Sequence, residues 1–337
     1  MKRIGHLFEK IVTFENLIRA AKRAARGKKS KNSVARYVID MEKDVIKLQE
    51  EFVTETYRPR PYNQFMIYEP KERNICSSDF SDRVAHHAIC GIIEPIFERR
   101  LIHDSYACRV GKGTHSAIRR CQEFSRQYRY FLKCDISKYF ESIDHVLLKN
   151  LLSRIFKDEK LLRLLGKIID HSVPGSVVGK GVPIGNLTSQ HFANLYLGEL
   201  DHFIKEVLRV PGYIRYMDDF ILFHDSKDFL SNAHQQIEAF IDAKLALRLK
   251  EKATMLAPVS QGIPFLGFRV FRGLIRVQRK NLVRLRRSVK RRERQFIEGK
   301  ISEEHLVLSM NSLIEHISQA DSTSLLRKEV LASLEMA

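Results

Sequence analysis

The chain has 337 residues, of which 44% are hydrophobic and 29% are charged. This composition is that of a folded protein with a real core, and it excludes disordered, collagen-like and low-complexity architectures. The unusual feature is the charge, because 58 Lys and Arg against 40 Asp and Glu leave a net charge of +18. Such an excess indicates a polyanionic partner, either a nucleic acid or an acidic membrane surface.

The excess charge lies in two blocks. Residues 1–31 hold ten basic and two acidic side chains, and residues 272–300 hold twelve basic and two acidic ones. The rest of the chain is balanced. Most charge runs are only solvated faces, but two blocks that carry the whole excess predict two ends of a groove that holds a long anion.

The cysteines, the apolar runs and the first residues indicate the compartment in which the chain is expected. None of the five cysteines belongs to a C-x-x-C motif, so we expect reduced thiols that are mostly buried. No apolar run approaches the roughly 18 residues of a membrane span. Residues 1–10 also lack the apolar core and cleavage site of a secretory signal. These features predict a cytoplasmic protein with no membrane partner.

Hydrophobic periodicity predicts the elements in chain order. Apolar residues at helical spacing indicate helices over 4–18, 34–52, 82–101, 146–169 and 188–208. Extended segments are expected as a hairpin over 64–80 with its turn at 69–72, a strand at 130–134, and two strands within 213–223; residues 106–114 form a glycine-containing loop. Strands interleaved with helices, without regular βαβ repetition, predict the α+β class.

Three aspartates carry the candidate chemistry. Asp135 ends an apolar strand, and Asp218 and Asp219 lie at the tip of a hydrophobic hairpin. Adjacent carboxylates repel each other unless a cation neutralises them or water solvates them. An Asp-Asp dipeptide alone is weak evidence, because turns favour Asp for backbone reasons, but the tetrapeptide Tyr216-Met217-Asp218-Asp219 is a stronger signal.

A third carboxylate on a neighbouring strand would complete an oxygen cage for two Mg²⁺ ions, or for Mn²⁺ in their place. Two such ions about 4 Å apart support an in-line displacement at phosphorus. Nucleotide polymerisation is that reaction, and basic side chains near the triphosphate complement its charge.

These residues carry a family resemblance. The tetrapeptide at 216–219 resembles the Y-x-D-D motif of reverse transcriptases, and Asp135 with an aromatic five residues later resembles their first catalytic motif. The other matching segments follow in the family's order: the fingers hairpin at 68–73, the S-Y-x-x-R-x-G-x-G loop at 105–113, a lysine-bearing motif at 249–254 and a primer-grip turn at 265–268. The resemblance covers residues 60 to 275.

The resemblance implies a right-hand polymerase fold with fingers, a palm of antiparallel sheet and helices, and a helical thumb. The expected regions are a basic helical extension at 1–60, fingers at 61–130, a palm at 131–270 in which 146–180 returns to the fingers, and a thumb at 271–337.

One motif departs from the general pattern. Most reverse transcriptases carry Q-G-x-x-x-S-P where this chain has I-G-x-x-x-S-Q at 184–190. That form resembles the bacterial and phage enzymes of diversity-generating retroelements, within the group II intron-like lineage. These enzymes copy a template RNA with frequent errors at adenines and so diversify a target gene, a process called mutagenic retrohoming. Ile184 cannot donate the hydrogen bonds of a Gln amide, so control of the new base pair should be weaker. The alternative is that Ile184 simply packs in the core.

The resemblance also implies a role for each matching residue. Asp135 and Asp218 hold both metals, Asp219 supports the cage, and the Ile136 carbonyl supplies a further oxygen. Lys252 protonates the departing pyrophosphate, although a lone lysine is usually just solvated.

Binding roles follow in the same way. Phe140 is the gate that excludes a ribose 2′-OH and so selects dNTPs, its alternative being an aromatic core residue. The dNTP is expected to meet Lys71 and Arg73 at its β- and γ-phosphates, and Ile184, Gly185 and Gln190 near its base. Arg109 braces either the templating nucleotide or the fingers loop, and the template–primer duplex contacts Phe265, Leu266 and Gly267.

The two basic blocks acquire positions from the resemblance. After the primer grip, Leu282, Leu285, Val289 and Phe296 lie at helical spacing among cations that include Arg284, Arg287 and Arg291. One face of this helix should pack, and the other should hold the phosphates of the RNA–DNA duplex. The amino-terminal block should meet template RNA or an accessory protein, which the resemblance implies is a small, basic, helical oligomer.

Two other functions stay open. One is another bacterial reverse transcriptase, group II intron-like or defence-associated. About 60 residues follow the primer-grip segment, enough for a thumb but not for maturation and endonuclease domains, and the motifs of retron-type enzymes are missing. The other is a catalytically silent RNA-binding protein, which has no need of three mutually repelling carboxylates beside an anionic ligand.

Overall fold

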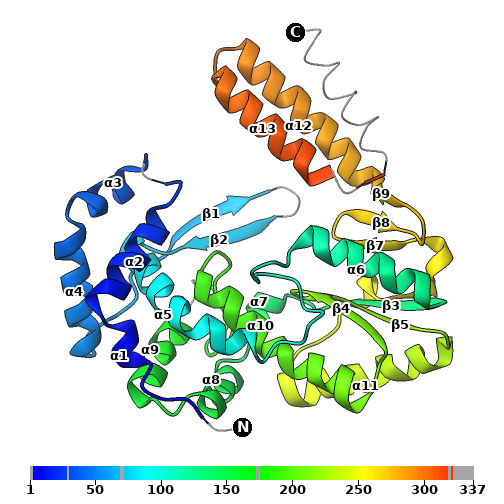
Figure 1. Cartoon of the computed structure of the whole chain (residues 1–337), viewed down its shortest axis with the longest axis horizontal. Helices are drawn as coiled ribbons and strands as arrows, with labels where there is room; N and C mark the ends of the chain where they lie inside the picture. The colour runs from blue at the N-terminus through cyan, green and yellow to red at the C-terminus, as the bar shows by residue number, and fades with distance from the viewer. Residues whose placement is uncertain are drawn as a thin grey trace.

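The structure is a computed structural model that describes residues 3–28, 30–68, 72–171, 173, 175–317, 320 and 321. The helices of residues 8–98 lie on one side, a central sheet lies on the other, and a pair of helices projects above them as an arm (Figure 1). Helices and antiparallel sheets are mixed along the chain, which confirms the α+β class.

Four helices precede the first strand: α1 (Phe8–Ile11), α2 (Phe14–Ala25), α3 (Asn32–Ile39) and α4 (Met41–Val53). The sequence predicted two longer helices here, and each is interrupted. Thr13 separates α1 from α2 because its side chain accepts a hydrogen bond from the Asn16 amide, which makes it a helix start rather than a helix interior. Asp40 stands between α3 and α4.

The predicted hairpin over 64–80 is present as β1 (Asn63–Ile67) and β2 (Arg73–Ser77), which pair antiparallel. Its turn, expected at 69–72, falls largely on residues 69–71, which lie outside the described residues. Helix α5 (Phe80–Glu98) follows at once, because the Asp79 side chain accepts the Ser81 amide and caps it. The apolar side of α5 packs against α2.

The central sheet has four antiparallel strands in the order β4 (Gly212–Tyr216), β5 (Asp219–His224), β3 (Tyr130–Asp135), β6 (Met255–Pro258). Alternate residues of its strands enter two different clusters. One cluster packs under α6 (Thr114–Gln127), and the other packs against α10 (Leu187–His202) and α11 (Lys227–Leu245). A sheet covered by helices on both faces leaves the strand ends as the accessible edge (Figure 1).

The segment between β3 and β4 holds α7 (Tyr139–Ser142), α8 (His145–Ile155) and α9 (Glu159–Asp170). The predicted single helix over 146–169 is therefore two helices, because the Asp158 side chain caps α9 by accepting the Leu161 amide at 3.3 Å. Helix α10 continues into a π-helical turn, η1 (Phe203–Val207). Short 3₁₀ turns, η2 (Glu251–Ala253) and η3 (Val259–Gln261), flank β6.

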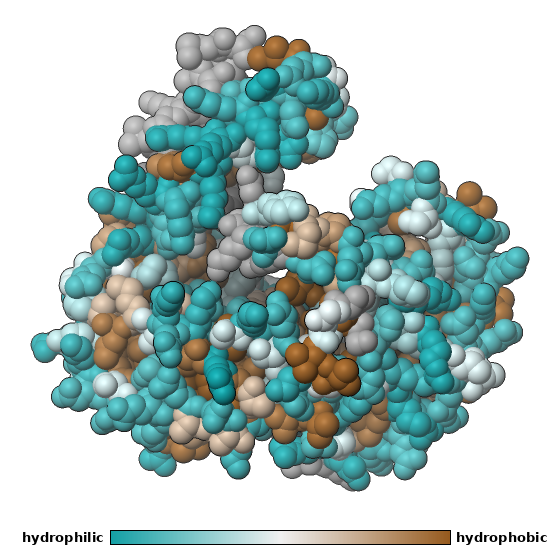
Figure 2. Space-filling model, turned by 180° about the vertical axis from the view of Figure 1, so that it is seen from behind, coloured by the Kyte–Doolittle hydropathy of each residue, from teal (hydrophilic) through white to brown (hydrophobic). Residues whose placement is uncertain are grey.

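The projecting arm begins after a three-stranded sheet, made of β7 (Ile263–Phe265), β8 (Phe268–Val270) and β9 (Ile275–Val277). It consists of α12 (Arg279–Ile297) and α13 (Glu303–Ile317). Leu285 and Val289 are buried as the spacing predicted, but Phe296 is 39% exposed. Hydrophilic side chains cover the arm, and a hollow separates it from the amino-terminal helices (Figure 2).

Two smaller expectations can be compared with the described part of the chain. Four of the five free cysteines are buried, as predicted, and Cys108 is exposed. Within the described ranges, no helix combines the length and the apolar character that crossing a membrane requires.

Candidate active site

The hairpin of β4 and β5 presents two of the predicted aspartates. Tyr216 pairs with Asp219 across the hairpin, which leaves Met217 and Asp218 as the two turn residues. Met217 has φ +56°, the left-handed backbone that two-residue hairpin turns require. A residue other than glycine in this conformation costs about 1–3 kcal/mol, so the surrounding structure must hold the turn in place.

The strand register brings the third aspartate to the same place. Asp135 is the direct cross-strand partner of Asp219, and the Ile136 amide donates to the Asp218 carbonyl at 3.3 Å. On its other side, the Asp135 carbonyl accepts the Lys250 amide at 2.8 Å. All three aspartates are half-buried at one edge of the central sheet. The structure thus gathers Asp135, Asp218 and Asp219, which the sequence predicted to act together.

A lysine that sequence reasoning missed completes this cluster. Lys133 forms an ion pair with Asp219, and its ammonium lies 5.8 Å from the centre of the Phe265 ring. Its side chain is only 13% exposed. The signal was available, because Lys133 precedes Asp135 by two residues on β3 and a strand puts such residues on the same face.

The charges of the cluster determine whether it suits a metal ion. Burial raises the pKa of Asp219 to about 6; Lys133 opposes this shift, and the carboxylates of Asp135 and Asp218 add to it. Within the described residues, no group of three or more His, Cys, Asp or Glu side chains has the arrangement that could hold a metal ion. The donor chemistry, three neighbouring carboxylates, nevertheless fits a divalent cation, with Lys133 now balancing Asp219.

A cavity of about 830 Å³ opens next to the segment that follows β3, and none of the three aspartates is among the residues that line it. Ile184 is half-buried and lines it, as do Ser137 and Lys138, which follow β3. The side chain of Ile184 therefore faces a cavity and is not enclosed in the core. Its carbonyl accepts the Cys76 amide at 3.2 Å, which ties this segment to β2.

Gly185, Phe140 and Gln190, which the sequence predicted to meet the nucleotide, do not line this cavity, but Gly185 and Phe140 each adjoin a residue that does. Gly185 has φ +122°, and a Cβ there would stand 3.3 Å from the Cys76 carbonyl oxygen, so the close approach to β2 favours glycine. Phe140 is half-buried, and its carbonyl accepts the Val182 amide at 2.8 Å. Gln190 is half-buried on α10. Lys71 lies outside the described residues, and of Arg73 only the backbone, at the start of β2, is described.

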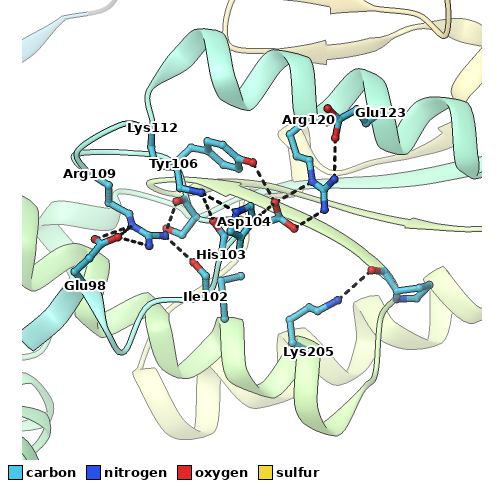
Figure 3. A network of polar contacts seen from close by, with 12 residues as sticks. Glu98, Ile102, His103, Asp104, Tyr106, Arg109, Lys112, Arg120, Glu123 and Lys205 are labelled. Carbon is cyan, nitrogen blue, oxygen red and sulfur yellow. Dashed lines mark hydrogen bonds and ion pairs between the residues drawn. The ribbon is translucent and has the colours of Figure 1, made fainter.

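Arg109 braces its own loop. Its guanidinium contacts the Glu98 carboxylate at 2.9 Å and donates to the carbonyls of Ile102 and Ser105 at 2.6 and 2.7 Å (Figure 3). The side chain is only 7% exposed. Of the two roles expected for Arg109, bracing the loop is the one these contacts support.

The same loop is joined to the hairpin of β4 and β5. Asp104 accepts hydrogen bonds from Arg120 and Tyr106 (Figure 3), and its carbonyl accepts the Arg215 amide at 2.9 Å. The Tyr106 amide in turn donates to the Arg215 carbonyl at 2.9 Å. The loop therefore lies along β4, directly before the turn that carries the aspartates.

A second buried charge was also missed from the sequence. The guanidinium of Arg215 meets the Asp201 carboxylate of α10, and both side chains are 0% exposed. The Tyr213 hydroxyl donates to the same carboxylate at 2.7 Å. Burial opposes the charge of Arg215, but Asp201 outweighs it, so that the pKa of Arg215 is raised. We call Tyr213, Asp201 and Arg215 the sheet triad. An arginine inside an apolar strand was the available signal, since such a charge needs a buried partner.

The remaining predicted residues lie on elements that follow α11 along the chain. Lys252 is exposed on η2, close in sequence to Lys250, whose amide contacts Asp135. Phe265, Leu266 and Gly267 form the β7–β8 turn, and the Gly267 carbonyl accepts the Gln278 amide at 3.0 Å, which anchors the start of α12. Arginines 284, 287 and 291 are exposed on α12.

Known proteins resemble the chain in sequence and in structure. Residues 69–270 match the family model described as reverse transcriptase (RNA-dependent DNA polymerase). The group II intron-encoded protein LtrA of Lactococcus lactis subsp. cremoris is 25% identical over 306 residues, which cover 70% of this chain and 50% of the relative. Protein YkfC of Escherichia coli (strain K12) is 26% identical over 272 residues, 67% of this chain and 70% of the relative.

The chain thus spans about half the length of LtrA. A telomerase structure from Candida albicans has a TM-score of 0.51 at 12% identity, covering 83% of this chain and 61% of that one. This likeness, with the helices and antiparallel sheets described above, confirms the predicted right-hand polymerase fold. Since the family model matches more than half of its residues, the chain belongs to the reverse transcriptase family.

Proposed function

We propose that this protein is an RNA-directed DNA polymerase that extends a DNA primer on an RNA template. The observation that carries the proposal is the convergence of Asp135, Asp218 and Asp219 at one sheet edge, in a chain of the reverse transcriptase family. In the reaction the primer 3′-hydroxyl attacks the α-phosphorus of a dNTP, and pyrophosphate leaves.

Asp135, Asp218 and Asp219 would hold the divalent cations, with the Ile136 carbonyl as a further oxygen. Bound Mg²⁺ or Mn²⁺ would lower the pKa of the attacking hydroxyl and stabilise the leaving oxygen. Lys133 balances the charge of Asp219 through their ion pair. Lys252 serves as the acid for pyrophosphate, and its exposed position on η2 leaves it able to approach the substrate.

The binding roles expected from the sequence are retained as part of this proposal. Lys71 and Arg73 meet the triphosphate, Phe140 excludes the ribose 2′-OH, and Gly185 and Gln190 border the nucleotide. The region boundaries at 60, 130 and 270 are likewise proposed, with 146–180 belonging to the fingers. The exposed arginines of α12 and the β7–β8 turn form the surface for the RNA–DNA duplex, because an arginine-rich face binds phosphates independently of sequence.

Primer extension on an RNA template with Mg²⁺ and dNTPs tests the activity. Asp218→Asn should reduce the rate by about 10³-fold or more, because several kcal/mol of charge stabilisation are lost and each 1.36 kcal/mol is tenfold. The matched control is Asp228→Asn, an exposed aspartate on α11 away from the cluster. Extension that survives Asp218→Asn would contradict the proposal.

We further propose that the enzyme is of the diversity-generating type, with template RNA, the RNA–DNA duplex and a small basic helical oligomer as partners. Support comes from the I-G-x-x-x-S-Q motif and from the position of Ile184, an apolar residue that lines the same cavity as Ser137 and Lys138. A side chain without hydrogen-bond donors there leaves the new base pair less constrained. The similarity to LtrA favours the alternative, a group II intron-like enzyme.

Sequencing of cDNA made from a mixed-base template separates these two. The diversity-generating type should show errors concentrated opposite adenine, and Ile184→Gln should reduce them by restoring donors to the site. Val177→Gln is the control, since Val177 lines the same cavity but is 70% exposed. Errors spread evenly over the four bases would leave the polymerase proposal standing and reject the subtype.

A further inference from the structure

We propose that Arg215 is a positioning residue for the catalytic turn, and that Asn194 couples this turn to the loop at 104–113. The proposal rests on the proposed polymerase function. It concerns two buried side chains that touch neither a substrate nor a metal.

The guanidinium of Arg215 is held on three sides. Its Nε and Nη2 donate to the two Asp201 carboxylate oxygens, each at 2.7 Å, so the plane of the group is determined by a two-point contact. Its Nη1 donates at 3.1 Å to the backbone carbonyl of Met217. That carbonyl belongs to the peptide that joins Met217 to Asp218.

The contact between Arg215 and the Met217 carbonyl lies at the strained residue of the hairpin. Met217 adopts left-handed backbone, a conformation that residues other than glycine keep only where the surroundings hold it. Because Arg215 grips the Met217 carbonyl, it sets the orientation of the following peptide and so the direction in which the Asp218 side chain leaves the turn. A fixed guanidinium can do this, whereas a lysine cannot satisfy Asp201 and the carbonyl in the same geometry.

Asn194 extends the network to the neighbouring loop. Its Oδ1 accepts from Arg215 at 3.1 Å, and its Nδ2 donates to the Ala107 carbonyl at 2.8 Å. Asn194 is 2% exposed, so water cannot replace either hydrogen bond, and breaking one would leave a buried polar group unpaired. One carboxamide on α10 thus supports both the catalytic turn and the loop that Arg109 braces.

The test uses a pair of substitutions that leaves no unpaired buried charge. Arg215→Met with Asp201→Asn removes the grip on Met217, while the new amide oxygen still accepts from Tyr213. The chain offers a matched control in the amino-terminal triad of Tyr57, Asp82 and Arg60. There too a tyrosine hydroxyl and a guanidinium donate to one buried aspartate, both at 3.0 Å, so Arg60→Met with Asp82→Asn makes the same chemical change away from the catalytic turn.

Single-turnover extension gives the first readout. A misplacement of the reacting groups by about 1 Å costs on the order of 100-fold in rate. We therefore expect the Arg215/Asp201 variant to lose about 100-fold in its maximal rate with little change in the dNTP concentration for half-maximal rate. The Arg60/Asp82 variant should keep a maximal rate within about threefold of wild type. Arg215→Lys, which keeps the charge opposite Asp201, should fold and show the same loss of rate.

Mn²⁺ binding to the full chain, followed by electron paramagnetic resonance, gives a second readout that needs no turnover. Affinity should fall in the Arg215/Asp201 variant and not in the control. Equal rates and equal Mn²⁺ affinities for the two double variants would overturn the inference. If the wild-type chain extends no primer, the proposed polymerase function fails, and the Mn²⁺ comparison still decides the role of Arg215.

Discussion

The sheet triad and the amino-terminal triad are built from the same three residue types, and both bury an aspartate that accepts a tyrosine hydroxyl. They differ at the arginine. Arg215 is 0% exposed and has a third partner in the Met217 carbonyl, whereas the Arg60 side chain is 33% exposed and has its additional contact with Glu51 at 3.5 Å. The amino-terminal triad thus only holds a chain segment in place, whereas the sheet triad also contacts the turn that carries Asp218.

A second difference lies in what remains when the arginine is removed. The Asp82 carboxylate also accepts the Arg60 backbone amide at 2.7 Å, a contact that survives any side-chain substitution there. Within the sheet triad, the hydrogen bond to Asp201 that does not come from Arg215 comes from the Tyr213 hydroxyl. The sheet triad therefore depends on its arginine more strongly.

Single substitutions of the two arginines sharpen this comparison most. Arg215→Ala should lower the free energy of unfolding by about 3–5 kcal/mol, because it leaves an uncompensated charge in the interior. Arg60→Ala should cost about 1–2 kcal/mol, since its guanidinium is partly solvated and the aspartate keeps two donors. Urea unfolding of the two variants measures both values, and equal losses would break the comparison.

Low pH should reduce the folding stability through His86, on the amino-terminal side of the molecule. His86 lies one turn after Asp82 on α5, and burial, assisted by the charges of His87 and His171, lowers its pKa to about 3. The unfolded value is about 6.5. A lowered histidine pKa contributes stability that is present above pH 6.5 and is lost as the pH falls towards 3.

At pH 5 this loss amounts to about 2 kcal/mol, at 1.36 kcal/mol per pH unit below the unfolded pKa. His86→Gln should remove that part of the pH dependence, because glutamine does not titrate and can still bond to Thr188, which lies 3.0 Å from His86 Nδ1. Unfolding at pH 7.5 and pH 5 for both proteins gives the difference. An unchanged pH slope in the variant would place the acid sensitivity elsewhere.

The smallest effect concerns the tyrosines. Tyr213→Phe and Tyr57→Phe each remove one hydrogen bond to a carboxylate from a side chain that is 1% exposed, at a cost of about 1–2 kcal/mol. Similar losses in thermal unfolding would confirm that the distinction between the triads lies in the arginine. If Tyr213→Phe costs much more than Tyr57→Phe, the tyrosine shares that distinction.

Local patterns predicted the elements well and their ends less well. The spacing of apolar residues placed helices correctly, but it ran through Thr13, Asp40 and Asp158, where polar residues begin or separate helices. An oxygen side chain that bonds to a backbone amide two or three residues on overrides hydrophobic periodicity, because periodicity reports which side is buried and not where the helix starts.

The sequence by itself determined the catalytic hairpin, since apolar strands around Met217 and Asp218 are a local signal, and it determined the two basic blocks and the order of the motifs. Only the tertiary structure decided the partners of buried charges. Lys133 meets Asp219, and Arg215 meets Asp201, because strand register and helix packing bring together groups separated along the chain. A charged residue in an apolar segment indicates that a buried partner must exist. Which residue is the partner depends on how the whole chain packs, so only the fold identifies it.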